Sequence, residues 1–190
     1  MPEKSRPLSF FEEKQNSSEL IFDGKVVHLY KDSITLPNGV PSTREYIKHV
    51  GAVCVVALTD ECEVICVKQY RYPFSSVLLE IPAGKLNYKE EDPTEAALRE
   101  LREETGAICK DMTYLGAYFS SPAILDEKIH IFLAEGLEFG MTDPDDDEFI
   151  ETVKIPLDTL VEMIMRGEVP DGKTQAAVMR VAYLLEKRNK

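Results

Sequence analysis

The sequence AGKLNYKEEDPTEAALRELREETGA, at residues 83–107, places a glycine-bearing loop before a helix that carries Glu100, Glu103 and Glu104. Positions i, i+3 and i+4 share one face of an α-helix, so the three carboxylates are expected side by side. Like charges at this spacing destabilise a helix, and a divalent cation would compensate them. Mg²⁺ prefers hard oxygen ligands and usually completes its coordination with substrate phosphates. The stretch therefore predicts metal-dependent phosphate chemistry.

The ends of this helix are marked in the sequence. Asp92 can cap the first turn, Pro93 suits the first helical position, and Gly106 suits the position that ends the helix. The predicted core-facing stripe consists of Thr94, Leu98 and Leu101. The small residues predicted to leave room for ligands on the carboxylate side are Ala96 and Ala97.

Length and charge limit the class of protein. A chain of 190 residues is enough for one domain with a small appended element. Its 22 Lys and Arg against 34 Asp and Glu give a net charge of −12. This balance argues against nucleic-acid and membrane partners, which require clustered positive charge. A small anionic substrate remains compatible, because a bound metal ion can invert the local field.

The cysteines and the N-terminus indicate the compartment. Cys54, Cys62, Cys66 and Cys109 form no C-x-x-C pair, and three of them fall in apolar, strand-like stretches. We expect reduced core thiols. The first 14 residues contain no apolar run of signal-peptide length, and no stretch approaches a membrane span. A cytoplasmic location is expected.

The pattern along the chain predicts an N-terminal strand segment at residues 1–48 and a main domain at residues 49–190. Residues 1–18 are polar and unpatterned, and residues 19–48 alternate around the turn signals Asp23-Gly24 and Asn38-Gly39, as in two hairpins. Further strands are predicted at residues 51–58, 63–70, 77–84, 112–121, 128–137 and 151–157. Two closing helices are predicted at residues 158–166 and from residue 174 to about residue 187.

Residues 83–107 resemble the Nudix box, G-x5-E-x7-R-E-(aliphatic)-x-E-E-x-G-(aliphatic). The matching residues are Gly84, Glu91, Arg99, Glu100, Leu101, Glu103, Glu104, Gly106 and Ala107. Six residues rather than five separate Gly84 from Glu91, and anchoring on Glu90 would move the extra residue into the next spacer. The alternative is an exposed helix of charge pairs, but nine pattern positions in order make chance a poor explanation.

The resemblance implies an α/β fold, the α/β/α sandwich with a mixed sheet, and hydrolysis of a nucleoside diphosphate linked to another group. It implies Glu100 and Glu104 as metal ligands, Glu103 as a further ligand, and the backbone carbonyl of Ala83 as another. Arg99 would orient these carboxylates. The expected metal is Mg²⁺, with Mn²⁺ as the alternative.

Flanking residues resemble the ADP-ribose pyrophosphatase group within this family. They are Gln69-Tyr70-Arg71, the run EIPAGKL at residues 80–86, and Ser120-Ser121-Pro122-Ala123 followed by Asp126-Glu127. The group more often has glycine where Ala123 stands. The resemblance implies a homodimer that cleaves ADP-ribose to AMP and ribose 5-phosphate, with substrate contacts from Arg71, Glu80, Ser121 and Glu127. The alternatives are a surface ion pair for Arg71 and a capping or structural role for Glu80.

An acidic stretch, DPDDDEF at residues 143–149, is typical of a solvated loop. In the group that this chain resembles, a loop glutamate moves towards the metals as base or ligand. Glu148 is the first candidate for the base and for a further metal ligand. Asp146 and a box glutamate such as Glu103 are the alternatives.

Residues 167–174 match the phosphate-loop pattern G-x-x-x-x-G-K-[ST] through Gly167, Gly172, Lys173 and Thr174. That mechanism requires a buried strand before the loop, whereas here an amphipathic helix precedes it and Pro170 lies within it. We interpret the segment as a turn between two helices. Three other functions stay open: hydrolysis of another nucleotide sugar or dinucleotide, non-catalytic binding of ADP-ribose, and ATP binding at this phosphate-loop match, which the change Lys173→Ala would abolish.

Overall fold

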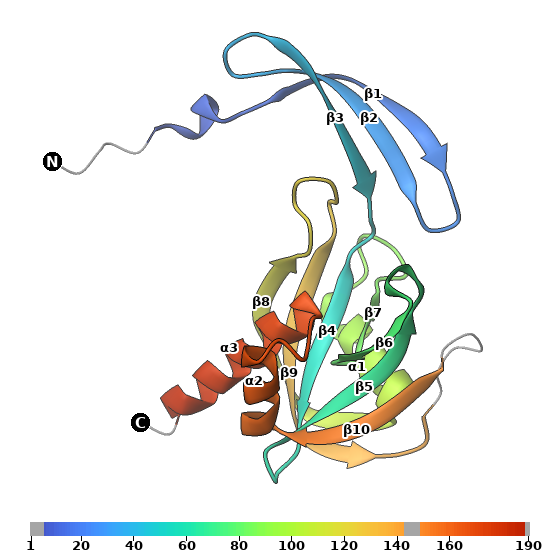
Figure 1. Cartoon of the computed structure of the whole chain (residues 1–190), viewed down its shortest axis with the longest axis vertical. Coiled ribbons are helices and arrows are strands. Elements are labelled where there is room, and N and C mark those ends of the chain that lie inside the picture. Colours follow the sequence, from blue (N-terminus) through green and yellow to red (C-terminus); the bar gives the residue numbers. More distant parts are fainter. Residues whose placement is uncertain (1–5, 143–148, 189–190) are drawn as a thin grey trace, which may run out of the picture. The chain divides into compact units, whose positions relative to one another are not determined.

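The computed structural model describes residues 6–142 and 149–188. The chain divides into two compact units (Figure 1). The first unit comprises residues 1–49 and 121–127, and the second comprises residues 50–120 and 128–190. Within the described ranges, no helix has the length and apolar character needed to cross a membrane.

The first unit is built on an antiparallel sheet. Its described elements are the 3-10 helix η1 (Leu8–Phe10) and the strands β1 (Lys14–Asp23), β2 (His28–Thr35) and β3 (Pro41–Lys48). The predicted turns connect these strands, and Gly39 has a φ of +84°, a left-handed conformation that glycine adopts without strain. The two hairpins are therefore confirmed. Strand β1 begins at Lys14, before the predicted start of the strand pattern at residue 19, because β1 is exposed along its whole length and needs no apolar alternation.

Residues 121–127 join this unit through backbone hydrogen bonds. The amide of Ile47 donates to the carbonyl of Ile124 at 2.9 Å, and the amide of Asp126 donates to the carbonyl of Ile47 at 3.2 Å. The predicted first segment, residues 1–48, did not include this stretch, because the contacts join residues that are far apart in the sequence.

The second unit contains a mixed sheet, as predicted. Its described strands are β4 (Ala52–Leu58), β5 (Glu63–Arg71), β6 (Ser76–Glu80), β7 (Ala83–Lys85), β8 (Ala107–Phe119), β9 (Lys128–Phe139) and β10 (Ile150–Pro156). The main order is β10-β5-β4-β9-β8, with β6 paired to β5 and β7 paired to β4. Strands β4 and β9 are parallel, and the other pairs are antiparallel.

The sheet splits between β4 and β5, and the residues of the candidate site lie next to this split. The two strands pair directly only at Ala57 and Leu58 of β4. Beyond that point β5 pairs with β6, and the first half of β4 pairs with β7. The chain from β6 to β7 therefore crosses the split at Ile81 and Pro82. The carbonyl of Pro82 accepts a hydrogen bond from the amide of Val55 at 2.9 Å.

Helices cover both faces of this sheet, which confirms the α/β/α sandwich (Figure 1). The helices are α1 (Pro93–Thr105), α2 (Leu157–Met165) and α3 (Gly172–Arg188). Strand β4 is buried on both faces, and its side chains point alternately to one face and the other. Val53, Val55 and Ala57 pack with α1. The side chains of Cys54, Val56 and Leu58 pack with α2 and α3.

The predicted core thiols are found at Cys54 and Cys66, which are buried and free. Burial raises the pKa of each thiol to about 12, so both stay protonated at neutral pH. Cys109 is half-buried and Cys62 is exposed.

The segment that matches the phosphate-loop pattern joins α2 to α3, as predicted. Gly167 follows α2 with a φ of +76°. Gly172 opens α3, and a Cβ there would lie 2.5 Å from the hydroxyl oxygen of Tyr118. Both glycines therefore have structural reasons that involve no phosphate.

Candidate active site

Helix α1 begins and ends at the residues that the sequence predicts. The carboxylate of Asp92 accepts a hydrogen bond from the amide of Thr94 at 2.7 Å, and Pro93 is the first helical residue. Gly106 adopts a left-handed conformation, and its amide donates to the carbonyl of Arg102 at 2.8 Å. These caps fix where the box glutamates lie along the helix.

The carboxylates of α1 border its buried face. Glu100 is 8% exposed and Glu104 is 4% exposed, although both are ionisable. The apolar residues buried with them are Ala96, Ala97 and Leu101. The predicted core-facing role of Thr94 and Leu98 was wrong, because both are exposed. The alanines face the sheet instead, so the helix presents its glutamates at the edge of the packed interface.

Arg99 holds several of these carboxylates in place. Its Nη1 donates to Glu100 Oε1 at 2.7 Å and to Glu103 Oε2 at 3.2 Å. Its Nη2 donates to the carbonyl of Lys85 at 3.2 Å. Burial alone would lower the pKa of Arg99, but Glu100 and Glu103 raise it above the ordinary value. The guanidinium thus fixes two glutamates and ties α1 to β7.

The contacts of the loop before α1 favour Glu91 over Glu90 as the glutamate of the box pattern. The Oε1 of Glu91 lies 3.7 Å from Nη2 of Arg99. Its carboxylate also accepts hydrogen bonds from the amide and the side chain of Asn87, at 2.5 and 3.1 Å. Glu90 is exposed. The extra residue is therefore accommodated in the loop, and the connection to the helix is kept.

Strand β7 lies against the carboxylates at close range. The amide of Ala83 donates to Glu104 Oε2 at 3.1 Å. A Cβ at Gly84 would lie 2.0 Å from the carboxyl carbon of Glu100, so only glycine leaves room for that carboxylate. The box glycine is thus explained by the space that Glu100 occupies.

The donor set suits a divalent cation. The glutamates on this side are Glu91, Glu100, Glu103 and Glu104, and the arginines near them are Arg99 and Arg102. This leaves an excess of negative charge in carboxylate oxygens, the ligands of hard cations. Within residues 6–142 and 149–188, no three His, Cys, Asp or Glu side chains are already gathered as a metal cage. Mg²⁺ needs no such cage, since it uses one or two carboxylates, waters and substrate phosphates.

A second cluster of charges lies at the split in the sheet. Glu80, at the end of β6, is 2% exposed. Its Oε1 accepts from Nε of Arg71 at 2.7 Å, and its Oε2 accepts from Nη2 of Arg71 at 2.6 Å. Its Oε2 also accepts from Nζ of Lys173, which lies 3.1 Å from Asp171 Oδ2. The result is an alternating chain of two cations and two anions.

The pKa of Glu80 reflects these partners. Burial would raise it, but the hydrogen bonds and charges of Arg71 and Lys173 outweigh burial and lower the pKa below its ordinary value of 4.5. The bond to Glu80 in turn raises the pKa of Arg71. Both groups are therefore charged at neutral pH. The sequence suggested a structural role for Glu80 as an alternative to substrate contact, and this buried geometry favours it.

Four predicted site residues are not part of the described second unit. Ser121 and Glu127 belong to the first unit, where Glu127 Oε1 lies 3.6 Å from Nδ1 of His49. Glu148 and Asp146 lie outside the described residues. The first residue of β10, Ile150, pairs with Gln69, which is two residues from Arg71 in β5.

Sequence reasoning missed the contribution of α3. The residues concerned are Asp171, Lys173 and Thr174. All three residues lie within the segment that matches the phosphate-loop pattern, but from the sequence we interpret that segment only as a turn. An Asp three residues before a Thr at the start of an apolar helix indicates a cap, and it would have located Asp171.

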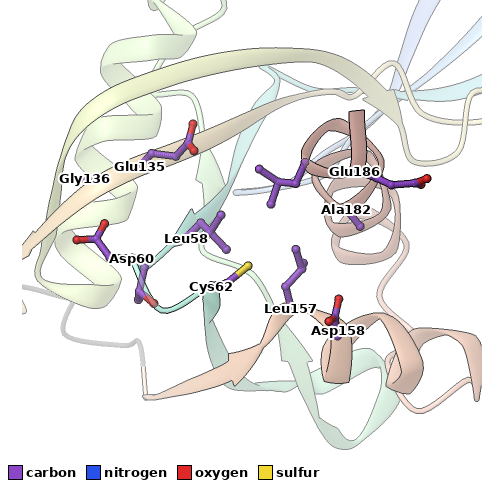
Figure 2. A pocket seen from close by; sticks show the side chains of 11 residues that line it. Leu58, Asp60, Cys62, Glu135, Gly136, Leu157, Asp158, Ala182 and Glu186 are labelled. Carbon is purple, nitrogen blue, oxygen red and sulfur yellow. The ribbon is translucent and has the colours of Figure 1, made fainter. Parts of the chain in front are cut away.

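A cavity of about 540 Å³ lies at the other end of β4, near Leu58. Its carboxylates are those of Asp60, Glu135, Asp158 and Glu186 (Figure 2). Strand β7 pairs with residues 52–54 of β4, so the box glutamates are remote from this cavity. Four carboxylates would repel a phosphate anion, and α1 with β7 remains the better site.

Comparisons with known proteins identify the family to which the chain belongs. The NUDIX domain family matches residues 48–177. An ADP-ribose pyrophosphatase of Bacillus subtilis (strain 168) is 46% identical over 173 residues, which cover 90% of this chain and 93% of the relative. A methanol dehydrogenase activator of Bacillus methanolicus is 45% identical over 170 residues, or 88% and 91% of the two chains.

A solved structure described as an ADP compounds hydrolase superposes with a TM-score of 0.84, covering 97% of this chain and 98% of that chain. Its sequence identity is 22%, so it supports the fold alone. The matched domain spans the box helix, β7 and the charge cluster at Glu80. The predicted resemblance is confirmed, and the chain belongs to the Nudix family of hydrolases.

Proposed function

We propose that this protein hydrolyses the pyrophosphate bond of ADP-ribose, or of a related nucleoside diphosphate sugar, giving AMP and ribose 5-phosphate in the first case. The metal proposed is Mg²⁺, with Mn²⁺ as the alternative. The observation that carries the proposal is the buried pair Glu100 and Glu104 against β7, with Gly84 leaving room for the carboxylate. The similarity to an ADP-ribose pyrophosphatase supports the substrate class.

Each residue of the helix face has a task in this proposal. Glu100, Glu103 and Glu104 would hold the metal together with the carbonyl of Ala83. A bound divalent ion would neutralise the pyrophosphate and lower the pKa of water. Arg99 keeps Glu100 and Glu103 oriented through its two hydrogen bonds. Fixed carboxylates need no rearrangement when charge develops, which is how preorganised sites gain rate.

The substrate contacts and the base complete the proposal. Arg71 would donate to a phosphate, and Ser121 and Glu127 would contact the rest of the substrate. Glu148 is proposed as the base and a further metal ligand, with Asp146 or Glu103 as alternatives. The re-entry of the chain at Ile150, paired to Gln69, supports a base delivered near Arg71.

The test is product analysis in ¹⁸O-labelled water with Mg²⁺. We expect AMP and ribose 5-phosphate, with the label in one product, which identifies the phosphorus attacked. A panel of nucleotide sugars and dinucleotides would rank the substrates. A faster reaction with another nucleotide sugar would move the assignment within the same chemistry, whereas no Mg²⁺-dependent turnover of any member would sink it.

A second function is non-catalytic binding of ADP-ribose. The relative named as a dehydrogenase activator is nearly as similar as the pyrophosphatase, so similarity does not separate an enzyme from an activator. The intact set Arg99, Glu100 and Glu104 favours catalysis. Binding of ADP-ribose in calorimetry without Mg²⁺-dependent turnover would establish the binding function instead.

We also propose a homodimer in the cytoplasm, formed through the N-terminal segment at residues 1–48. All of β1 is exposed, including Leu20, Ile21 and Phe22. Exposed apolar residues clustered on one strand indicate an interaction surface. Free buried thiols suit a reducing compartment, and the net charge of −12 favours small-molecule over nucleic-acid or membrane partners. Light scattering at micromolar concentration tests the dimer, and a monomer mass would contradict it.

A further inference from the structure

Lys173 lies at a position where a positive charge is unfavourable unless nearby carboxylates compensate it. It is the second residue of α3, and the positive end of the helix dipole disfavours a cation there. Its side chain is only 12% exposed. The ammonium is compensated by Glu80 and Asp171. This partly buried cation at a helix N-terminus therefore depends on two carboxylates, one of them from the distant strand β6.

The start of α3 is attached firmly to the crossing between β6 and β7. The amide and hydroxyl of Thr174 donate to Asp171 Oδ2 at 2.9 and 2.5 Å. The same hydroxyl oxygen accepts a hydrogen bond from the amide of Ile81 at 3.0 Å. Ile81 lies between the two strand ladders and is fully buried, so its amide needs this acceptor. These bonds set the distance between Lys173 and Glu80.

The guanidinium of Arg71 is oriented by Glu80. Two of its five N–H groups donate to the carboxylate as a bidentate pair, which fixes the plane of the group. Its other three N–H groups meet no acceptor within the described residues, and the side chain is 39% exposed. Arg71 is thus turned so that its remaining donors can meet an anion. The direction in which they point depends on the rotamer of Glu80.

We propose that Lys173 is a positioning residue for Arg71, acting through Glu80. Without the ammonium, one carboxylate oxygen loses a charged donor and Glu80 can rotate, so the fork of Arg71 loses its fixed direction. The inference rests on the proposed function, because it takes Arg71 as the residue that contacts the phosphate. The lysine of the phosphate-loop match then acts on phosphate binding from a distance, with no phosphate contact of its own.

The test is a double-mutant cycle measured by steady-state hydrolysis of ADP-ribose with Mg²⁺. Lys173→Met should raise KM about tenfold while kcat stays within about threefold, since substrate binding rather than the reacting centre is affected. Lys173→Arg should restore KM to within about threefold of wild type because it keeps a cation there. Lys187→Met, at an exposed position of the same helix, is the matched control and should match wild type.

Arg71→Lys provides the second side of the cycle, because it keeps the charge but loses the bidentate fork. If Lys173 acts through Arg71, adding Lys173→Met to Arg71→Lys should raise KM by less than about twofold. An equal tenfold rise in both backgrounds, or an unchanged KM in Lys173→Met, would overturn the inference and leave the proposed function standing. No turnover by the wild type would overturn both. If Lys173→Met does not fold by circular dichroism, Lys173→Gln takes its place and is judged by the same outcomes.

Discussion

Glu80 and two glutamates of α1, Glu100 and Glu104, are all buried, but the charges at the two places are compensated differently. Glu80 is 2% exposed and receives two cations, Arg71 and Lys173. At α1, the guanidinium of Arg99 is shared among Glu91, Glu100 and Glu103, and Arg102 adds only a 3.8 Å contact with Glu103. Burying a carboxylate is costly unless it is paired and hydrogen-bonded. The charges of one cluster are therefore balanced within the protein, and those of the other are left to be balanced by a ligand.

This difference separates a carboxylate held by two cations from carboxylates that would hold a metal ion. A cluster whose charges balance gains nothing from a metal ion, whereas an acidic face with a shared arginine does. Mutations that remove charge should then have different signatures: a loss of stability at Glu80, together with the weaker substrate binding proposed through Arg71, and a loss of catalysis at α1. Four predictions test this contrast, starting with the largest effect.

Glu104→Gln should lower kcat roughly 10³-fold, a loss typical of removing one preorganised charged group from a reacting centre. The amide keeps an oxygen that can accept the Ala83 hydrogen bond, so the fold should be retained. The measurement is AMP release at saturating Mg²⁺. Glu95→Gln, on the exposed first turn of the same helix, is the control. Wild-type kcat in Glu104→Gln would refute the metal assignment.

Glu80→Gln should lower the free energy of unfolding by about 3 kcal/mol, because two partly buried cations lose their carboxylate. Urea denaturation measures this value. The control is Glu151→Gln, which removes an exposed ion pair with Lys68 (3.1 Å) and should cost less than about 1 kcal/mol. Equal losses in the two variants would mean that the Glu80 cluster does not support the fold.

Gly84→Ala should reduce kcat/KM about a hundredfold, since a displacement of the order of 1 Å in a reacting group can have this effect. The new Cβ would lie 2.0 Å from the carboxyl carbon of Glu100 and must displace it. Gly140→Ala is the matched control, because its Cβ would meet only the carbonyl oxygen of Gly106 at an ordinary 3.6 Å. Unchanged kinetics in Gly84→Ala would show that Glu100 can move without loss.

The smallest effect is on the pH dependence of stability. The pKa of Glu80 is lowered in the folded protein, so its contribution is present above the unfolded value of about 4.5 and is lost as pH falls through the folded pKa. The stability difference between wild type and Glu80→Gln should therefore shrink between pH 7 and the acid limit of folding. Urea titrations at pH 7, 5 and 4 would measure it. If the stability difference grew on acidification, the pKa of Glu80 would be raised rather than lowered in the folded protein.

The sequence predicted those features of the fold that depend on neighbouring residues. Asp92, Pro93 and Gly106 fixed both ends of α1, because capping depends on a few neighbouring residues. Leu98 was placed in the core because its side chain is apolar, but the helix packs its alanines inward to bring Glu100 and Glu104 to the sheet. Periodicity cannot reveal that a charged face borders the core.

Non-local contacts were beyond the sequence. The start of β1 at Lys14 carries no apolar pattern, since that strand is exposed throughout. The role of Thr174 depends on the amide of Ile81, which lacks a ladder partner only because β4 and β5 diverge. One sequence without its pairing register cannot show where a strand crossing leaves such an amide.

The bond between Lys173 and Glu80 joins residues 93 positions apart, and this has a consequence for the order of folding. Contacts of such long range form late, because the intervening chain must be closed first. During synthesis all residues of the box helix have emerged by residue 106, whereas Glu80 gains its second cation only when α3 docks. The positioning that we propose for Arg71 therefore depends on the last helix of the chain.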